Sequence, residues 1–282
     1  MHSPKILIGI LVIDRPNTTR KCFEQLFKHT DRNSFVLVVV DNNSNDATKS
    51  LLQEYRKDID VLIENEWNHG CAFGVNQYLA VRMPGMHCLD VNADAHILVD
   101  DWLPMMLRVI NEKDIGVASG KRPDLFYDDG RYQYYRDCFT VINRGGEAVE
   151  WDKVNNSIIF PWAMMKSDLI EEIGYMNEKT CIDDINYCVR VAAVGKKCVY
   201  IPNVVILQPH GEEPQNHPEY KANREMVMMH WSEHIATSTI ETVTVGCGSR
   251  FIPGSITDPV YQRASDANYN FFKNYKRTHG LE

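Results

Sequence analysis

Acidic, amide and imidazole side chains gather in Leu89–His96 (LDVNADAH), at the end of an apolar run. Asp90, Asn92, Asp94 and His96 can each offer a ligand atom. Carboxylate oxygens suit Mg²⁺ or Mn²⁺, and such a cation can bridge a diphosphate. A strand-end loop with an Asx turn has the same composition. The stretch therefore indicates either a metal and phosphate site or a plain turn.

Two further acidic clusters follow the same pattern. Asp41 opens DNNSNDAT directly after FVLVVV and can accept hydrogen bonds from a base or ribose. A turn rich in Asn and Asp that caps a helix explains the same residues. Asp183 and Asp184 stand in CIDDINYCVR, at the start of a helix predicted over Asp183–Val194. One of them can serve as a general base, although the helix dipole alone also favours acidic residues there.

A glycine pair and a late histidine complete the candidates. Gly70 and Gly74 stand at a predicted helix start, where the backbone can approach a phosphate-bearing ligand or simply turn tightly. The spacing is not GxGxxG, so a dinucleotide site gains little support. His210 follows the run VVILQP. A lone histidine is more often a satisfied polar group, but a nearby carboxylate site favours a metal ligand.

The elements that would position these residues alternate between strands and helices. Apolar runs predict strands, and windows with one apolar face predict helices, so we expect an α/β fold with a parallel sheet. Polar loops follow the strands and should meet at one edge, where open α/β sheets bind ligands. The predicted strands are Ile6–Ile13, Phe35–Val40, Val61–Ile63 and the run MHCLDV; the helices are Thr19–Lys28, capped by Asn17 or Thr18, Ala47–Arg56, capped by Ser44 or Asp46, and the segment GCAFGVNQYLAVR.

The second half of the chain is less regular. Lys121–Phe160 is rich in Tyr, Gly and charge and predicts an irregular insertion or a small antiparallel piece. Phe160–Ile173 predicts a strand then a helix, and Lys197–Leu207 one or two strands. The polar stretch PQNHP suggests a boundary. We expect a domain over residues 1–213 and a C-terminal extension over 214–282, which would serve as a lid or acceptor-binding segment.

Composition narrows the function classes. The 282 residues carry a net charge of −8, which disfavours broad electrostatic capture of nucleic acid or anionic membrane. Ile6–Ile13 is too short to span a bilayer and lacks a signal-peptide cleavage pattern, so a cytoplasmic location is expected. Eight scattered cysteines without a CxxC pair favour reduced thiols over disulfides or a zinc site.

Taken in order, the motifs resemble the family 2 glycosyltransferases of GT-A fold. The resemblance runs from Lys5 to about Gly211. It implies a Rossmann-like, mostly parallel sheet flanked by helices, a nucleotide-sugar donor, most often UDP-linked, and Mn²⁺ or Mg²⁺. The motifs are a strand followed by DRP, then VVVDNNSNDAT, NHGCAFGVN, NAD before DWL, FPWAMMKSDLIEEIGYMNE, DDINYCVR and a late histidine.

The resemblance assigns donor-binding roles to the first loops. It implies that Val12 and Asp14 lie against the nucleobase, that Asp41 reads the base, and that Gly70 lies near the ribose and diphosphate. Asp14 replaces the family's usual Asn, and Ile13 replaces a residue that is commonly aromatic. The identity of the base therefore stays open.

In this resemblance NAD corresponds to the DxD motif of the family. Asn92 takes the first position near the donor, and Asp94 is the metal-linked carboxylate, with His210 as the late metal ligand. Related sequences place a tryptophan about ten residues after the motif begins, and Trp102 is ten residues after Asn92 but twelve after Asp90. Asp90 is then expected to bond neighbouring backbone, and His96 to be a bystander.

DDINYCVR is similar to the family's EDxDLCxR. Asp183 takes the Glu position, Asp184 the catalytic-base position and Asn186 the second Asp position. The mechanism this implies is one direct displacement, with inversion at the anomeric carbon. Trp162 departs from the small residues common before AMMKSDL; it either packs or faces the cleft, and we favour the cleft.

Two other functions stay open. One is a nucleotide-sugar-binding module without catalysis, and the other is a nucleotidyltransferase of similar fold, for which DRPNTTRK is a poor activation loop. No motif in the sequence identifies the acceptor. A saccharide, a lipid-linked glycan or a protein fits the family, and a modified nucleic acid is a further alternative.

Overall fold

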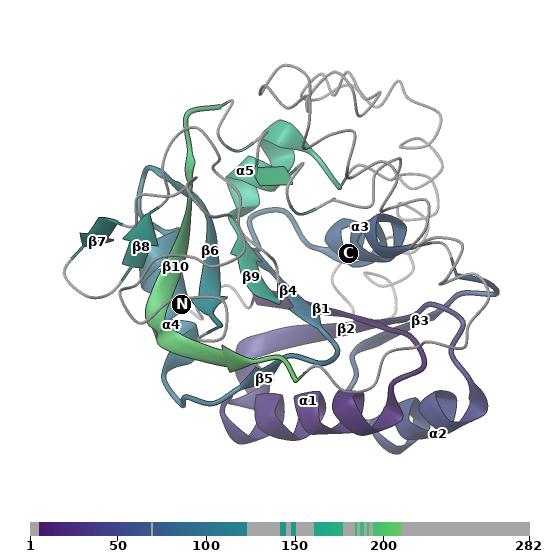
Figure 1. The fold of residues 1–282 in the computed structure, drawn as a ribbon. Helices are drawn as coiled ribbons and strands as arrows, with labels where there is room; N and C mark the ends of the chain where they lie inside the picture. Colours follow the sequence, from purple (N-terminus) through teal and green to yellow (C-terminus); the bar gives the residue numbers. More distant parts are fainter. Residues whose placement is uncertain are drawn as a thin grey trace, which may run out of the picture.

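Strands from most of the chain form one curved sheet (Figure 1). The computed structural model describes residues 6–68, 70–122, 161–176, 184, 187–188, 191 and 194–209, together with the backbone of 142–144 and 148–150. Within these residues the sheet has the order β3-β2-β1-β4-β9-β6-β10-β8-β7, and β5 pairs with the end of β10. The strands are β1 Ile6–Val12, β2 Phe35–Asp41, β3 Val61–Glu64, β4 Cys88–Asn92, β5 His96–Ile97, β6 Ile115–Lys121, β7 Ile142–Arg144, β8 Ala148–Glu150, β9 Trp162–Met165 and β10 Lys197–Leu207.

Helices cover both faces of this sheet. Figure 1 shows α1 and α2 below it and α3 and α5 above it. Alternate residues of β1 divide between two apolar cores: Ile8 and Ile10 pack with α1 and α4, whereas Leu7 packs with α3 and α5. This alternation is the normal consequence of a strand buried on both faces. The helices are α1 Pro16–Lys28, α2 Asp46–Glu54, α3 Cys71–Val81, α4 Trp102–Ile110 and α5 Ser167–Ile173, with a 3₁₀ turn at Arg32–Ser34.

The strand directions bring distant loops to one edge. β1 runs parallel to β2 and β4, and β2 runs parallel to β3. β9 is antiparallel to both β4 and β6, and β10 is parallel to β6. It follows that β6 and β10 point the same way as β1 to β4. We call the side where these strands end the carboxyl edge and the side where they begin the amino edge.

Two of the expected helix caps are wrong. α1 begins at Pro16, which needs no N–H partner at that position, so Asn17 and Thr18 lie inside its first turn. In α2 the cap is Asn45, whose side-chain oxygen accepts from Thr48 N at 3.0 Å, and not Ser44 or Asp46. Ser44 instead bonds to the loop after β1, as described below.

The predicted irregular middle contributes a small antiparallel hairpin. β7 pairs with β8, and β8 pairs with β10, both antiparallel. This confirms the antiparallel alternative within the described part of 121–160. Lys197–Leu207 is one strand, β10, with an irregularity between Ile201 and Val205. The 214–282 extension lies outside the described residues.

Helix length and cysteine state are defined where the structure describes the chain. None of its helices is both long and apolar enough to cross a bilayer. The described cysteines are free thiols, and all but Cys71 are buried; they are Cys22, Cys71, Cys88, Cys188 and Cys198.

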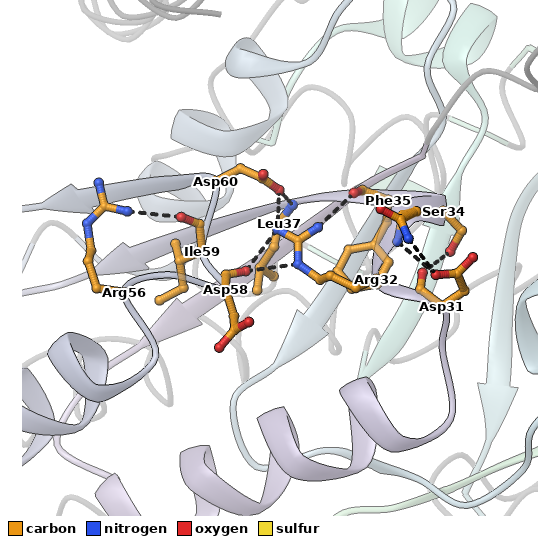
Figure 2. A network of polar contacts seen from close by, with 10 residues as sticks. Asp31, Arg32, Ser34, Phe35, Leu37, Arg56, Asp58, Ile59 and Asp60 are labelled. Atoms are coloured by element: carbon orange, nitrogen blue, oxygen red, sulfur yellow. Dashed lines mark hydrogen bonds and ion pairs between the residues drawn. The ribbon is translucent and has the colours of Figure 1, made fainter.

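A dense polar network closes the amino edge where β2 and β3 begin (Figure 2). The Arg32 guanidinium donates from Nη2 to Asp60 Oδ2 at 2.6 Å, and from Nε and Nη2 to the Asp58 carbonyl at 3.1 and 2.9 Å. Its Nη1 donates to the Phe35 carbonyl at 3.1 Å. Asp60 Oδ2 also accepts from Leu37 N at 2.7 Å. Every nitrogen of this arginine therefore has a partner that fixes the start of a strand.

Candidate functional site

The carboxyl edge holds the polar loops after β1, β2, β4, β6 and β10. Along the sheet, β2 and β3 lie on one side of β1, and β4 lies on the other. The chain therefore reverses its winding direction between β1 and β4. Open α/β sheets bind ligands in the crevice at such a switch point. The loops that begin at Asp14 and Asp94 flank it.

Asp41 ends β2 with its carboxylate fully buried. Oδ1 accepts from Ser44 N at 2.9 Å, whereas the buried Oδ2 has no hydrogen-bond partner in the described part of the chain. An unpaired buried carboxylate oxygen costs free energy, so it needs an explanation. A donor N–H from a bound base would supply the missing partner.

The loops after β1 and β2 are bonded to each other. Asp14 has a positive φ of 47°, which is uncommon for a residue other than glycine. Its N–H donates to Ser44 Oγ at 3.2 Å, and its Oδ1 accepts from Asn45 N at 2.6 Å. Val12 is fully buried, and its carbonyl accepts from Asn42 N at 2.9 Å. Val12 therefore supports the loop pair through its backbone while its side chain packs in the core.

An amide network, absent from the sequence-based candidates, holds the loop before α3. Asn42 Nδ2 donates to Asn68 Oδ1 at 2.6 Å and to the Gly70 carbonyl at 3.2 Å. Asn65 Nδ2 donates to Asn42 Oδ1 at 3.0 Å, and Asn65 and Gln77 exchange two further bonds. Gly70 has a φ of +88°, the left-handed backbone that favours glycine. The glycine loop is thus tied to the end of β2 beside Asp41.

Asp94 lies at the centre of a second network, which links four strand ends. Arg15 Nη1 donates to its Oδ2, forming an ion pair, and Gln208 Nε2 donates to its Oδ1 at 2.7 Å. Arg122 Nη1 in turn donates to Gln208 Oε1 at 2.5 Å. Arg15 follows β1, Asp94 follows β4, Arg122 follows β6 and Gln208 follows β10. Arg15 therefore contacts the carboxylate directly, whereas Arg122 is linked to it through Gln208.

Arg15, Arg122 and Gln208 are not among the site residues predicted from the sequence. Their positions were the available signal: Arg15 stands in the DRP motif, Arg122 directly follows the strand β6, and Gln208 directly follows the apolar run VVIL. Polar residues at that position converge on the ligand-binding edge of a parallel sheet.

Cys22 and His96 also lie within electrostatic reach of Asp94. Burial, followed by the Asp94 charge, raises the pKa of the Cys22 thiol, so this cysteine stays protonated. Burial lowers the pKa of His96, whose Nε2 lies 3.4 Å from the Thr18 carbonyl. The imidazole of His96 is thus bonded to α1, and its role as a bystander stays a prediction.

Asp90 is buried on the α3 side of the sheet. Its Oδ1 accepts from the Tyr78 hydroxyl at 2.5 Å, so a side chain takes part where we expected backbone partners. Burial, and then the charge of Asp90, raises the pKa of that tyrosine. A Cβ on Gly9 would lie 2.3 Å from the Tyr78 ring, so this glycine allows the close approach of α3. Asp90 belongs to the packing of α3 on β1 and β4.

Trp162 packs in the core instead of facing the cleft. It pairs with Val91 across β4 and β9, and cross-strand partners point to the same face of a sheet. That face carries α4, and the Trp162 ring lies edge-on against Trp102, with centroids 5.1 Å apart. Its side chain is fully buried. The packing alternative therefore holds.

The remaining candidates are only partly described. Asp184 is a helical residue of intermediate exposure, whereas Asp183 and His210 lie outside the described residues. Within the described ranges no group of three or more His, Cys, Asp or Glu side chains could hold a metal. Asn92 is half-buried at the end of β4, and its carbonyl accepts from Ala95 N at 2.8 Å.

The Asp94 carboxylate nevertheless fits the chemistry of a hard divalent cation. Mg²⁺ and similar ions are commonly held by one or two carboxylates together with substrate phosphates and water. Each Asp94 oxygen has one described hydrogen-bond partner, and a carboxylate oxygen has two lone pairs. Asp94 can therefore contribute one ligand, with the others from a bound diphosphate.

A family model named Glycosyl transferase family 2 matches residues 8–174. Solved structures share the fold. A mannosyltransferase from Pyrobaculum calidifontis, in complex with GDP-Man and Mn²⁺, is 16% identical with a TM-score of 0.62, over 96% of this chain and 75% of that one. S. aureus TarS 1-349, in complex with UDP-GlcNAc, is 16% identical with a TM-score of 0.56, over 96% and 81%.

Two curated relatives are similar over a small part of their own length. The uncharacterized protein y4gI of Sinorhizobium fredii is 22% identical over 82% of this chain and 28% of its own. The O-antigen biosynthesis protein RfbC of Myxococcus xanthus is 22% identical over 70% of this chain and 16% of its own. The chain thus spans less than a third of either relative.

Proposed function

Because the chain belongs to glycosyl transferase family 2, we propose that it moves a sugar from a nucleotide-sugar donor to an acceptor hydroxyl. The observation that carries this proposal is the arrangement at the switch point between β1 and β4. There Asp41 follows β2, the loop at Asp14 follows β1 and Asp94 follows β4, and Arg15 joins the last two through its ion pair with Asp94. Asp41 suits a nucleoside, and Asp94 with Arg15 suits a diphosphate.

The donor nucleotide is proposed to be UDP-linked. Asp41 Oδ2 is a buried acceptor without a described partner, and the N3–H of uracil is a donor that could satisfy it. Gly70 allows backbone to approach the ribose and diphosphate. Gln208 and Arg122 hold the Asp94 carboxylate toward the crevice. Val12 acts only through the backbone bond that positions Asn42.

Asp94, with His210, is proposed to hold Mn²⁺ or Mg²⁺. When bound, this cation would neutralise charge that develops on the leaving diphosphate. Asp184 is proposed as the base that removes the proton from the acceptor hydroxyl, with Asp183 beside it. The hydroxyl oxygen then attacks the anomeric carbon as the bond to the diphosphate breaks. A single displacement inverts the configuration.

The acceptor is proposed to be a saccharide, a lipid-linked glycan or a protein. The 214–282 extension is the proposed lid or acceptor-binding segment. A relative named for O-antigen biosynthesis agrees with a saccharide acceptor, although the chain spans only 16% of that protein.

Thermal shift with nucleoside diphosphates tests the donor assignment. We expect UDP with Mn²⁺ to raise the melting temperature more than UDP or Mn²⁺ alone, and more than the other nucleotides. A larger shift with GDP would move the assignment to that base. The absence of a shift with every nucleotide would contradict nucleotide-sugar binding altogether.

Product analysis tests the reaction. With donor and acceptor present, the enzyme should release nucleoside diphosphate; release of pyrophosphate would indicate a nucleotidyltransferase instead. Asp184→Asn should abolish transfer while its affinity for UDP with Mn²⁺ stays unchanged. Retained turnover in Asp184→Asn would remove that residue from the base role.

A further inference from the structure

Arg15 uses little of its hydrogen-bonding capacity. One described contact, from Nη1 to Asp94, engages a guanidinium that carries five N–H donors. Its Nε is buried and has no hydrogen-bond partner among the described residues. The side chains of the ion pair are 22% and 11% exposed, so the pair is partly accessible to solvent. An arginine that retains unused donors at a ligand-binding edge is prepared for a second anion.

Arg15 also stands where a cation would bind. It engages Asp94 Oδ2, while Gln208 engages Oδ1. A divalent ion on that carboxylate would face the guanidinium at close range, and like charges at a few ångströms repel strongly at a half-buried site. A cation alone therefore competes with Arg15 for Asp94.

A diphosphate removes this conflict. Its oxygens accept from arginine in pairs of parallel hydrogen bonds, the geometry that a guanidinium favours. If Arg15 turns from Asp94 to a phosphate oxygen, the carboxylate becomes available to the cation. The cation and the diphosphate then favour each other's binding, and linkage requires the effect to be reciprocal.

We propose that Arg15 is the exchangeable counter-ion of Asp94. In the donor-free protein it neutralises the carboxylate, and in the loaded protein it binds a phosphate oxygen of the donor while the divalent cation occupies Asp94. This inference rests on the proposed function, because the anion is the diphosphate of the nucleotide sugar.

Gln208 and Arg122 make the exchange feasible. Arg122 is 5% exposed, and its bond to Gln208 Oε1 orients the amide so that Nε2 faces Asp94. When Arg15 leaves, the carboxylate therefore keeps one hydrogen bond and its position. The loss of Arg15 should change ligand affinities far more than it changes the structure of the site.

The decisive measurement is Mn²⁺ binding to the ligand-free protein, followed by electron paramagnetic resonance of free Mn²⁺. The variant is Arg15→Gln. The matched control is Arg20→Gln. It removes an exposed ion pair between Arg20 in α1 and Glu54 in α2. We expect Arg15→Gln to bind Mn²⁺ alone about tenfold more tightly than wild type, because its competitor is gone. Arg20→Gln should match wild type.

Calorimetry of UDP binding in saturating Mn²⁺ gives the second half of the test. Arg15→Gln should bind UDP about tenfold to a hundredfold more weakly, which is the range for losing charge-assisted hydrogen bonds. Arg15→Lys keeps the charge but not the paired donors, so it should retain wild-type competition with Mn²⁺ and lose part of the UDP affinity. Asp94→Asn should lose Mn²⁺ binding in the absence of nucleotide.

The outcomes separate this inference from the proposed function. If wild type binds UDP or GDP with Mn²⁺, and Arg15→Gln binds both Mn²⁺ and the nucleotide as wild type does, the exchange is wrong and the proposed function stands. If wild type binds no nucleoside diphosphate at all, the proposed function fails first. Circular dichroism melting of each variant confirms that it folds.

Discussion

Two arginine–aspartate pairs at opposite edges of the same sheet differ in how they are satisfied. At the amino edge, Arg32 bonds Asp60 and two backbone carbonyls, and Asp60 bonds a strand N–H (Figure 2). At the carboxyl edge, Arg15 bonds Asp94, and Asp94 bonds Gln208, all through side chains. Side chains bonded to backbone hold an element in place. Side chains bonded only to one another can rearrange without moving it.

Buried groups without partners sharpen the contrast. Arg15 Nε and Asp41 Oδ2 are both buried and lack described hydrogen-bond partners. Each nitrogen of Arg32 has one. Unsatisfied buried groups lower stability, so they persist where another requirement retains them. The guanidinium of Arg32 is therefore fully used by the fold, whereas Arg15 and Asp41 keep buried groups that a ligand can satisfy.

The largest expected effect compares Asp94→Asn with Asp60→Asn. Removing the charge of Asp94 should lower transfer by about a hundredfold or more, the scale of losing a charge-stabilising group at a reaction centre. Asp60→Asn should lower the melting temperature and leave kcat unchanged well below it. Initial rates and melting curves of both variants decide the matter. A large rate loss in Asp60→Asn would contradict the division between the edges.

The next effect is on stability, where we expect the amino-edge variant to be affected more than the carboxyl-edge variant. Arg32→Gln should lower the free energy of unfolding by about 2 kcal/mol, because two backbone carbonyls and one carboxylate lose their hydrogen-bond donor. Arg15→Gln should lower it by less than about 1 kcal/mol, because Asp94 keeps Gln208. Urea unfolding of the two variants measures both values. Equal losses would mean that Arg15 is also a structural residue.

A smaller effect tests the same rule within the carboxyl edge. The side chain of Asn45 caps α2 by accepting from Thr48 N, whereas its backbone N–H binds Asp14 Oδ1. Asn45→Ala should lower the free energy of unfolding by about 1 kcal/mol, the usual value for a helix cap. Its UDP affinity should stay near that of wild type, since the bond to Asp14 comes from the backbone. A strong loss of affinity would show that the cap side chain also serves the ligand.

The sequence predicts the parts of this molecule that depend on local pattern. β1, β2 and β4 are buried on both faces, so their apolar runs were readable, and the ends of these runs located Asp41 and Asp94. The cap of α2 was misassigned because Asn43, Ser44, Asn45 and Asp46 are all good caps and only backbone geometry selects among them. The family assignment depended on the order of several motifs, each weak on its own.

The Asp94 network and the orientation of Trp162 depend on long-range pairing and could not be predicted from the sequence. The bonds that build the Asp94 network join residues 79, 86 and 114 positions apart. The antiparallel insertion of β9 set which way Trp162 points, and no local signal carries strand direction or register. The sequence therefore predicted a candidate site at the carboxyl edge, whereas only the fold showed the arginines that lie there.

The smallest effect compares two histidines, the half-buried His87 at the amino edge and the buried His96 at the carboxyl edge. Burial lowers the pKa of both His87 and His96 below the ordinary value of 6.5. The unfolded chain then takes up protons first, so stability is constant above about pH 7.5 and falls as the pH drops through 6.5. His87 Nδ1 accepts from Ser167 N at 3.1 Å and loses that bond on protonation. His96 Nε2 donates to the Thr18 carbonyl and keeps its bond.

We therefore expect His87→Gln to flatten the decline in the free energy of unfolding between pH 7 and pH 5 more than His96→Gln does. Urea unfolding at several pH values measures the slope. Asp168 favours the charged form of His87, whereas Lys166 and Arg82 oppose it. Because these charges partly cancel, high salt should change the pH dependence of stability much less than removal of the His87 ring does. If His96→Gln flattens the decline more, then protonation of His96 destabilises the fold more than protonation of His87. The difference between the two edges would then not extend to their histidines.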